Sequence, residues 1–134
     1  MIEVERKYRG TPAAVEAVTA LADSTGERVQ QTDLYLNAPD RDFAVTDEAL
    51  RIRSTTPAEG DTRVAITYKG PRATTAEKAR TEHEVGVETL GTTAAIFEAL
   101  GYTEVARVTK QRQRWRWADL EVAIDTLAGG ERYI

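Results

Sequence analysis

Glu3-Val4-Glu5-Arg6-Lys7 opens the chain and places charged side chains at alternate positions. In a β-strand successive side chains point to opposite faces, so Glu3, Glu5 and Lys7 would share one face. Burying such a row costs several kcal/mol for each charge unless the charges are paired, hydrated or bound to metal. The stretch therefore predicts either a functional site on the inside of a sheet or an edge strand whose charged face is solvated.

The composition favours one soluble domain spanning residues 1–134. The chain is 30% charged and 41% hydrophobic, and it has no apolar run of the roughly 18 residues that a membrane span needs. It shows no signal-peptide pattern, and without cysteine it has neither disulfides nor thiolate metal ligands. We therefore expect a cytoplasmic protein. The net charge of -4 argues against a general nucleic-acid binder.

Alternating patterns predict seven strands and a short eighth one after Gly130, with two helices inserted. The first helix should begin at Thr11-Pro12 and end near Ser24-Thr25-Gly26, and the second should be capped by Thr92 or Thr93 and closed by Gly101. We expect a mainly antiparallel β protein with little α-helix. The predicted strands are the first, which ends near residue 10, and those at about 28–36, 50–53, 62–69, 80–87, 104–117 and 120–125.

Each predicted strand has an apolar face and a face rich in charge. In an ordinary barrel or sandwich the charges would be solvated on the outside, and that alternative stays open here. Against it, basic residues recur strand after strand although the net charge is negative. The single histidine, His83, falls on the non-acidic side of its strand and is interpreted as a surface or packing residue. The recurring basic residues are Arg51, Arg53, Lys69, Arg80, Lys110 and Arg112.

Binding of a polyphosphate together with a divalent cation requires both kinds of charge. Arginine and lysine match phosphate oxygens, and carboxylates supply the hard oxygen ligands that Mg²⁺ or Mn²⁺ prefers. Neither set is stable alone in a closed, low-dielectric space, whereas together with ligand and metal they neutralise one another. We therefore predict a charged tunnel that needs its ligand. The acidic set would be Glu3, Glu5, Glu82, Glu84 and Asp125.

The opening stretch resembles the E-x-E-x-K signature of the CYTH superfamily, the triphosphate tunnel metalloenzymes that include class IV adenylyl cyclases and thiamine triphosphatases. Further segments resemble the family's elements in the same order along nearly the whole chain. The resemblance implies an eight-stranded closed β-barrel tunnel of antiparallel strands with a few peripheral helices. The matching segments are 31–36, 49–53, 67–71, 80–84, 110–112 and 124–126.

The resemblance also implies roles for individual residues. Glu3, Glu5 and Lys7 would be catalytic, and Mg²⁺ or Mn²⁺ would be held by Glu3 and Glu5, with Glu82, Glu84 and Asp125 sharing that role or positioning water. Phosphates would be bound by Lys7, Arg51, Arg53, Lys69, Arg80, Lys110 and Arg112.

The partner would be a small-molecule triphosphate, with no nucleic acid and no membrane; a homodimer is one oligomeric state that the sequence allows. The reaction favoured by the resemblance is conversion of ATP to cyclic AMP and pyrophosphate. The alternatives are hydrolysis of thiamine triphosphate or tripolyphosphate, and a non-catalytic sensor of polyphosphates or nucleotides.

The end of the chain departs from the family pattern. Tyr133-Ile134 occupy the aromatic and aliphatic positions that precede a second E-x-E pair in the family, and the sequence then stops. The last strand is therefore expected to be truncated, and the C-terminal glutamates and helix of the family are absent. Because the preceding basic and acidic positions match, we favour a sequence that continues beyond Ile134.

Overall fold

The computed structural model describes residues 2–21, 26–73, 79–117 and 120–134. The described residues are mainly β, as predicted. The strands are β1 (Ile2–Glu3), β2 (Glu27–Asn37), β3 (Ala49–Pro57), β4 (Arg63–Lys69), β5 (Arg80–Val87), β6 (Thr103–Trp117), β7 (Leu120–Leu127) and β8 (Arg132–Tyr133). The helices are α1 (Pro12–Leu21), α2 (Phe43–Thr46) and α3 (Leu90–Ala99).

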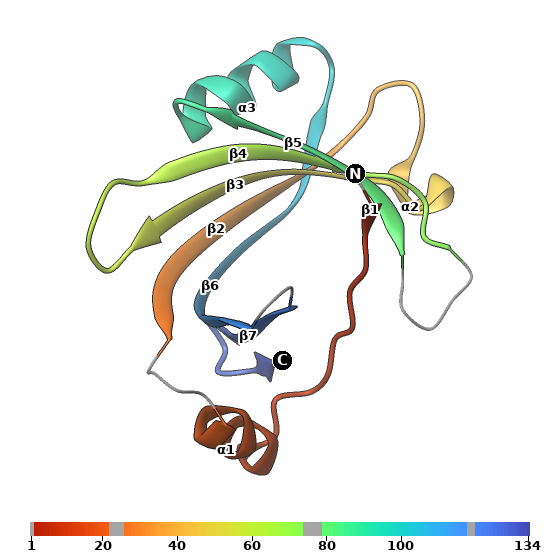
Figure 1. Ribbon diagram of the computed structural model, residues 1–134. Helices are drawn as coiled ribbons and strands as arrows, with labels where there is room; N and C mark the ends of the chain where they lie inside the picture. Colours follow the sequence, from red (N-terminus) through yellow and green to blue (C-terminus); the bar gives the residue numbers. More distant parts are fainter. Residues whose placement is uncertain (1, 22–25, 74–78, 118–119) are drawn as a thin grey trace.

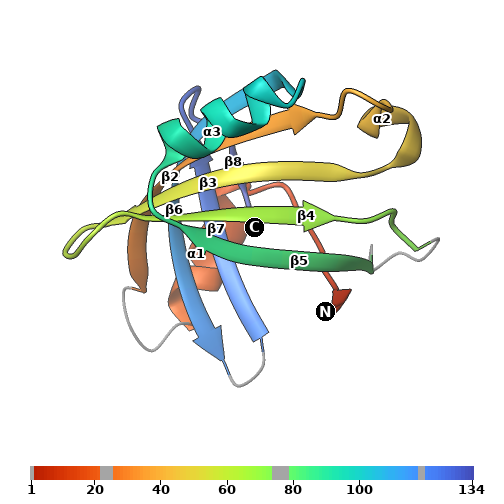
Figure 2. The same cartoon turned by 90° about the horizontal axis from the view of Figure 1, so that it is seen from above.

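Seven strands form one continuous antiparallel sheet in the order β5-β4-β3-β2-β6-β7-β8, and β1 pairs with the outer edge of β5. The sheet is strongly curved and wraps around a concave face, while α3 lies on the outside of the curve (Figures 1 and 2). β3 pairs with one side of β2, and β4 pairs with the far side of β3. β6 pairs with the other side of β2. β2 therefore lies in the middle of the sheet, between β3 and β6.

The ladder of strand pairs does not continue from β8 to β1, so a closed barrel is not shown. The chain that follows β1 does approach β8, because Tyr8 and Ile134 exchange two backbone hydrogen bonds of 2.8 Å and Gly10 N donates to Arg132 O at 2.7 Å. An isolated antiparallel bridge joins Arg9 to Tyr133. The eight predicted strands are present in one curved sheet, and these few backbone bonds link the segment after β1 to β8.

The first strand is much shorter than predicted. Only Ile2–Glu3 is a strand, paired with Arg80 and Thr81 of β5, whereas residues 4–8 are irregular, Arg9 forms only the isolated bridge, and residues 4–9 are exposed. A strand persists only where a neighbour supplies a ladder of hydrogen bonds, and β5 begins at Arg80. The alternation read from residues 3–7 therefore extends beyond the part of the segment that pairs with β5.

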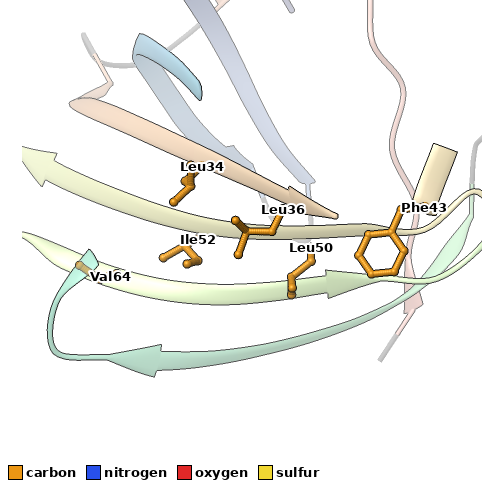
Figure 3. Close-up of a cluster of buried hydrophobic side chains, with 6 residues drawn as sticks. All are labelled: Leu34, Leu36, Phe43, Leu50, Ile52 and Val64. Carbon is orange, nitrogen blue, oxygen red and sulfur yellow. The ribbon is translucent and has the colours of Figure 1, made fainter. Parts of the chain in front are cut away.

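The hydrophobic core lies on the convex side of the sheet. The buried cluster comes from β2, β3, β4 and the residue that opens α2, and the partly buried Leu90, Ala94 and Phe97 of α3 pack against it (Figure 3). Because side chains alternate along each strand, the intervening polar residues face the concave side. The members of the buried cluster are Leu34, Leu36, Phe43, Leu50, Ile52 and Val64.

Polar residues of the concave face are as buried as the core. Asp33 has no exposed surface, and Thr67 and Gln31 are 1% and 2% exposed. A solvated outer face would leave such side chains in water, so the alternative of an ordinary barrel with its charges outside is wrong for β2, β3 and β4. The charged face predicted from the alternation is the inner one.

The helices partly match the prediction. In α1, Ala14 N donates to Thr11 Oγ1 at 3.1 Å, which confirms Thr11 as the cap. The helix α3 begins earlier than predicted, because Thr89 caps it and Gly91 lies within its first turn. The glycine at 101 has the predicted left-handed conformation, with φ of 96°. The short α2 was not predicted, and no described helix has the length and apolar character needed to cross a bilayer.

Candidate functional site

A row of alternating charges crosses the concave face from β3 to β7. Arg53 Nε and Nη2 donate to the two carboxylate oxygens of Asp33 at 2.6 and 2.8 Å. Lys110 Nζ lies 3.5 Å from Asp33 Oδ2 and 3.4 Å from Asp125 Oδ2. Arg112 in turn donates to both oxygens of Asp125 at 2.7 and 2.8 Å. We call Arg53, Asp33, Lys110, Asp125 and Arg112 the charge ladder.

The charge ladder keeps its two carboxyls ionised. Burial raises the pKa of Asp33, but the hydrogen bonds and charge of Arg53, together with the charges of Lys110 and Arg51, bring it below its ordinary value. Burial likewise raises the pKa of Asp125, and Arg112 and Lys110 outweigh it. The pKa of Lys110 is lowered, first by burial and then by the charge of Arg53. With three cations facing two carboxylates, the ladder has an excess of positive charge that an anion would relieve.

A second group lies on β3, β4, β5 and the segment after β1. Arg51 Nη2 donates to Thr67 Oγ1 at 3.3 Å, and Thr67 Oγ1 donates to Glu84 Oε1 at 2.7 Å. Arg51 Nε is buried and has no hydrogen-bond partner among the described residues. Burial, and secondly the charge of Arg53, lower the pKa of Arg51. This guanidinium is therefore incompletely compensated.

Beside these residues, Lys69 lies between two carboxylates. Its Nζ is 3.9 Å from Glu5 Oε2 and 3.9 Å from Glu82 Oε2. The same Glu82 oxygen is buried and accepts no hydrogen bond from the described residues. We call Arg51, Thr67, Lys69, Glu82 and Glu84 the open cluster, because two of its buried polar atoms lack hydrogen bonds.

The carboxylates beside Lys69 are of the right type for a hard divalent cation. Mg²⁺ commonly uses one or two protein carboxylates and keeps several waters. Glu82 Oε2, a buried oxygen without a hydrogen bond, fits such a ligand. Within the described part of the chain, no three His, Cys, Asp or Glu side chains gather closely enough to hold a metal ion. Glu3 lies opposite Arg80 in the backbone register, and its side chain lies outside the described residues.

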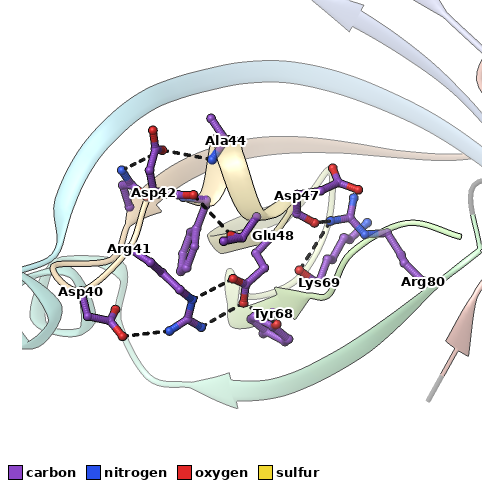
Figure 4. A network of polar contacts seen from close by, with 12 residues as sticks. Asp40, Arg41, Asp42, Ala44, Asp47, Glu48, Tyr68, Lys69 and Arg80 are labelled. Atoms are coloured by element: carbon purple, nitrogen blue, oxygen red, sulfur yellow. Dashed lines mark hydrogen bonds and ion pairs between the residues drawn. The ribbon is translucent and has the colours of Figure 1, made fainter.

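Arg80, which the sequence predicts to bind phosphate, donates to backbone carbonyl oxygens in this structure. Its Nε donates to Gly70 O at 2.8 Å, and its Nη2 donates to Asp47 O at 3.3 Å and Lys69 O at 3.4 Å. Figure 4 shows Arg80 beside Asp47 and Lys69, at the junction between α2 and the end of β4. In this arrangement Arg80 fixes the backbone that carries Lys69.

The α2 turn is itself tied to β4. Arg41 donates to Glu48 Oε1 and Oε2 at 2.7 and 2.9 Å, and Tyr68 Oη donates to Glu48 Oε2 at 2.6 Å (Figure 4). The hydrogen bonds from Arg41 and Tyr68 lower the pKa of Glu48 to about 2. The carboxylate thus stays charged, and the network holds the Asp47 carbonyl where Arg80 reaches it.

The structure groups most of the predicted residues, but not in one set. Lys7 is exposed, and its Nζ lies 5.2 Å from the centre of the Tyr133 ring. Asp125 lies in the charge ladder with arginine and lysine, whereas Glu5 and Glu82 lie near Lys69. The predicted acidic set is therefore divided between two places on the concave face.

Gln31, Asp33 and Thr67 lie on the concave face and were not among the predicted site residues. Gln31 Nε2 donates to Thr55 Oγ1 at 3.3 Å, and its Oε1 is buried without a hydrogen bond from the described residues. The signal that could have identified Gln31 and Asp33 is their alternation with Leu34 and Leu36, which puts them on the face opposite the core.

Comparisons with known proteins place the chain in a family. The model of the CYTH domain matches residues 1–133. A protein of Methanocaldococcus jannaschii named "Putative adenylate cyclase MJ0240" is 38% identical over 131 residues, which cover 96% of this chain and 72% of that protein.

Solved structures share the fold. The PH1819 protein from Pyrococcus horikoshii OT3 is 31% identical, with a TM-score of 0.89 over 99% of this chain and 75% of that one. HpAC1 from Hippeastrum, described as having a dominant triphosphatase activity, is 19% identical with a TM-score of 0.68, covering 98% of this chain and 76% of that one. At that identity the likeness to HpAC1 shows the fold alone. From the match over residues 1–133 and the relative in M. jannaschii, the chain belongs to the CYTH domain family.

Proposed function

We propose that this protein binds a triphosphate and a divalent metal on the concave face and acts on ATP as an adenylyl cyclase, releasing cyclic AMP and pyrophosphate. The observation that supports this is the burial of several cationic side chains on the concave face. The side chains of Arg53, Lys69, Lys110 and Arg112 are only 11 to 19% exposed. Such burial is costly unless each cation has a counter-charge, and in the charge ladder only two carboxylates face three cations.

The basic residues would hold and orient the phosphate chain. An arginine fork can donate two parallel hydrogen bonds to a phosphate, and a lysine can approach it as a point charge. Arg51 offers a buried Nε for such a bond, and both Arg51 and Lys110 would gain from a bound anion because burial disfavours their charges. Fixing the triphosphate this way aligns the reacting atoms and stabilises the charge that develops on the phosphoryl group.

Glu5 and Glu82 would hold Mg²⁺ or Mn²⁺, with Glu3 and Glu84 as further ligands. When bound, the metal would neutralise phosphate oxygens and polarise the phosphoryl group under attack. Lys69, now between Glu5 and Glu82, would then be released toward the phosphates. We also propose that the two sheet edges meet around the bound triphosphate as a tunnel, since backbone bonds already join Tyr8 to Ile134.

The nucleophile decides the product. In the cyclase reaction the 3′-hydroxyl of ATP attacks the α-phosphorus, and pyrophosphate leaves. In the second candidate function, a triphosphatase, water attacks the terminal phosphorus, the remaining diphosphate leaves, and the attacked phosphorus is released as orthophosphate. This second candidate is kept because HpAC1, a protein of the same fold, is described as having a dominant triphosphatase activity.

The test is incubation of the protein with ATP, thiamine triphosphate or tripolyphosphate, each with Mg²⁺ or Mn²⁺, followed by separation of the products. Cyclic AMP with pyrophosphate supports the cyclase, and orthophosphate supports the triphosphatase. Tight binding without product would indicate a sensor. Failure to bind any of the three compounds would overturn the proposal.

Glu5→Gln should lower metal-dependent turnover by about 100-fold, because an amide is a poorer ligand for a hard cation and removes a charge from the site. The matched control is Glu98→Gln, an exposed position on α3. Circular dichroism and melting should show that both variants fold as the wild type does. Equal turnover in the two variants would argue against Glu5 as a metal ligand.

A further inference from the structure

We infer that Thr67 is a positioning residue that couples phosphate binding at Arg51 to metal binding at Glu84. This inference rests on the proposed function, because Arg51 and Glu84 take their roles from it. Neither the opening motif nor the alternation of charges singled out Thr67.

The three residues face one another across adjacent strands. Arg51 of β3 pairs with Thr67 of β4, which pairs with Glu84 of β5. The two hydrogen bonds run in one direction, from the Arg51 guanidinium to the Thr67 hydroxyl at 3.3 Å and from that hydroxyl to the Glu84 carboxylate at 2.7 Å. The hydroxyl is therefore the only hydrogen-bonded link between the cation and the acid among the contacts described for these residues.

Burial makes the hydroxyl hard to replace. Thr67 is 1% exposed, so water has little access to substitute for it. A hydroxyl that accepts from a cation is polarised and donates more strongly to a carboxylate, so each bond strengthens the other. An anion on the guanidinium of Arg51 therefore changes the bond that orients Glu84.

The link also leaves the Nε of Arg51 available. Thr67 accepts a hydrogen bond from Arg51 Nη2, while the buried Arg51 Nε has no hydrogen-bond partner in the described part of the chain. On the other side it binds Oε1 of Glu84. Thr67 thus holds one end of each side chain and leaves Arg51 Nε for a ligand.

The experiment measures the affinity for tripolyphosphate by calorimetry, with and without Mg²⁺, in Thr67→Val, Thr67→Ser and the wild type. Valine has the shape of threonine without its hydroxyl, whereas serine keeps the hydroxyl. Thr109→Val, at an exposed position of β6, is the matched control. Before ligand is added, the Nε–H resonance of Arg51 in a ¹⁵N spectrum and the melting temperature of each variant are recorded.

Thr67→Val is expected to weaken metal-free tripolyphosphate binding about tenfold, as loss of a hydrogen bond to a charged group does. It should also reduce the factor by which Mg²⁺ raises the affinity, and it should shift the Arg51 resonance. Thr67→Ser should retain the wild-type affinity, Mg²⁺ factor and Arg51 resonance, because it keeps the hydroxyl. Thr109→Val should leave all three unchanged. A purely structural role would lower the melting temperature without changing the Mg²⁺ factor.

The outcomes separate this inference from the proposed function. If the wild type binds tripolyphosphate and Thr67→Val binds it with the same affinity and the same Mg²⁺ factor, the coupling role is wrong and the proposed function stands. If the wild type binds neither tripolyphosphate nor ATP, the proposed function fails and this inference fails with it.

Discussion

The charge ladder and the open cluster lie on the same concave face, but they differ in how completely their charges are paired. In the ladder, each aspartate receives two hydrogen bonds from one arginine, and Lys110 lies between the two carboxylates. In the open cluster, Arg51 Nε and Glu82 Oε2 are buried without hydrogen bonds from the described residues, and Lys69 is 3.9 Å from its carboxylate neighbours.

This difference in pairing indicates different roles for the two groups, one in the stability of the fold and one in ligand binding. A buried charge that is fully paired holds its partners in place, and removing one partner leaves the other buried without a counter-charge. A buried charge that is incompletely paired raises the energy of the ligand-free protein, and a ligand of opposite charge lowers it again. We therefore expect substitutions of the two ladder aspartates to act mainly on stability and substitutions in the open cluster to act mainly on binding.

The largest effect is expected for Asp33→Asn. The change leaves Arg53 and Lys110 buried without their shared counter-charge, so the free energy of unfolding should fall by about 3 to 5 kcal/mol. Urea denaturation measures it. The control is Glu121→Gln, which breaks an exposed ion pair of 3.7 Å with Arg116 and should cost at most about 1 kcal/mol. Equal losses in the two variants would show that the ladder is not a closed structural unit.

A somewhat smaller effect, and one on binding instead of stability, is expected for Arg51→Met. Methionine fills similar space without a buried charge, so the free energy of unfolding should stay equal or rise by about 1 kcal/mol. Tripolyphosphate binding should weaken about 100-fold, because a charge-assisted donor is lost. Calorimetry and urea denaturation together test the separation. A large loss of stability with unchanged binding would reverse the roles assigned to the two groups.

The smallest expected effect is a difference in acid sensitivity. The folded protein lowers the pKa values of Asp33 and Asp125 from 3.8, so their stabilisation is complete above that value and is lost as the pH falls through the lower folded values. Stability contributed by the ladder should be constant from pH 7 to about 5 and should fall below about pH 4. Asp125→Asn should show a shallower fall in urea denaturation series. Parallel curves for the two proteins would contradict the pairing.

Much of this fold could be predicted from the sequence, because side-chain alternation has a fixed period. Leu34 and Leu36 on one face of β2 determine that Gln31 and Asp33 lie on the other, and the same holds for Ile52 and its neighbours on β3. The basic residues of the site were found for this reason. Their division into two groups was not, because alternation gives the face of a residue and not its partner across the sheet.

Two features depended on contacts that local sequence does not encode. Arg80 has the spacing of the other concave residues, yet it bonds to three carbonyl oxygens because the α2 turn brings Asp47 to it. The opening stretch has the alternation of a long strand, yet only Ile2–Glu3 has a neighbour to pair with. In both places tertiary contacts decide what the residues do.

The order of the strands also has a consequence for how the molecule assembles. Arg53 reaches Asp33 through the pairing of β2 with β3, which are close in the sequence. Lys110 and Arg112 lie on β6, and the segment between β2 and β6, which must close as a loop, contains β3, β4, β5 and α3. Closing such a loop has an entropic cost that neighbouring strands do not incur. During folding, Asp33 therefore acquires its second cation only when that loop is closed, and the two halves of the ladder join in the same step.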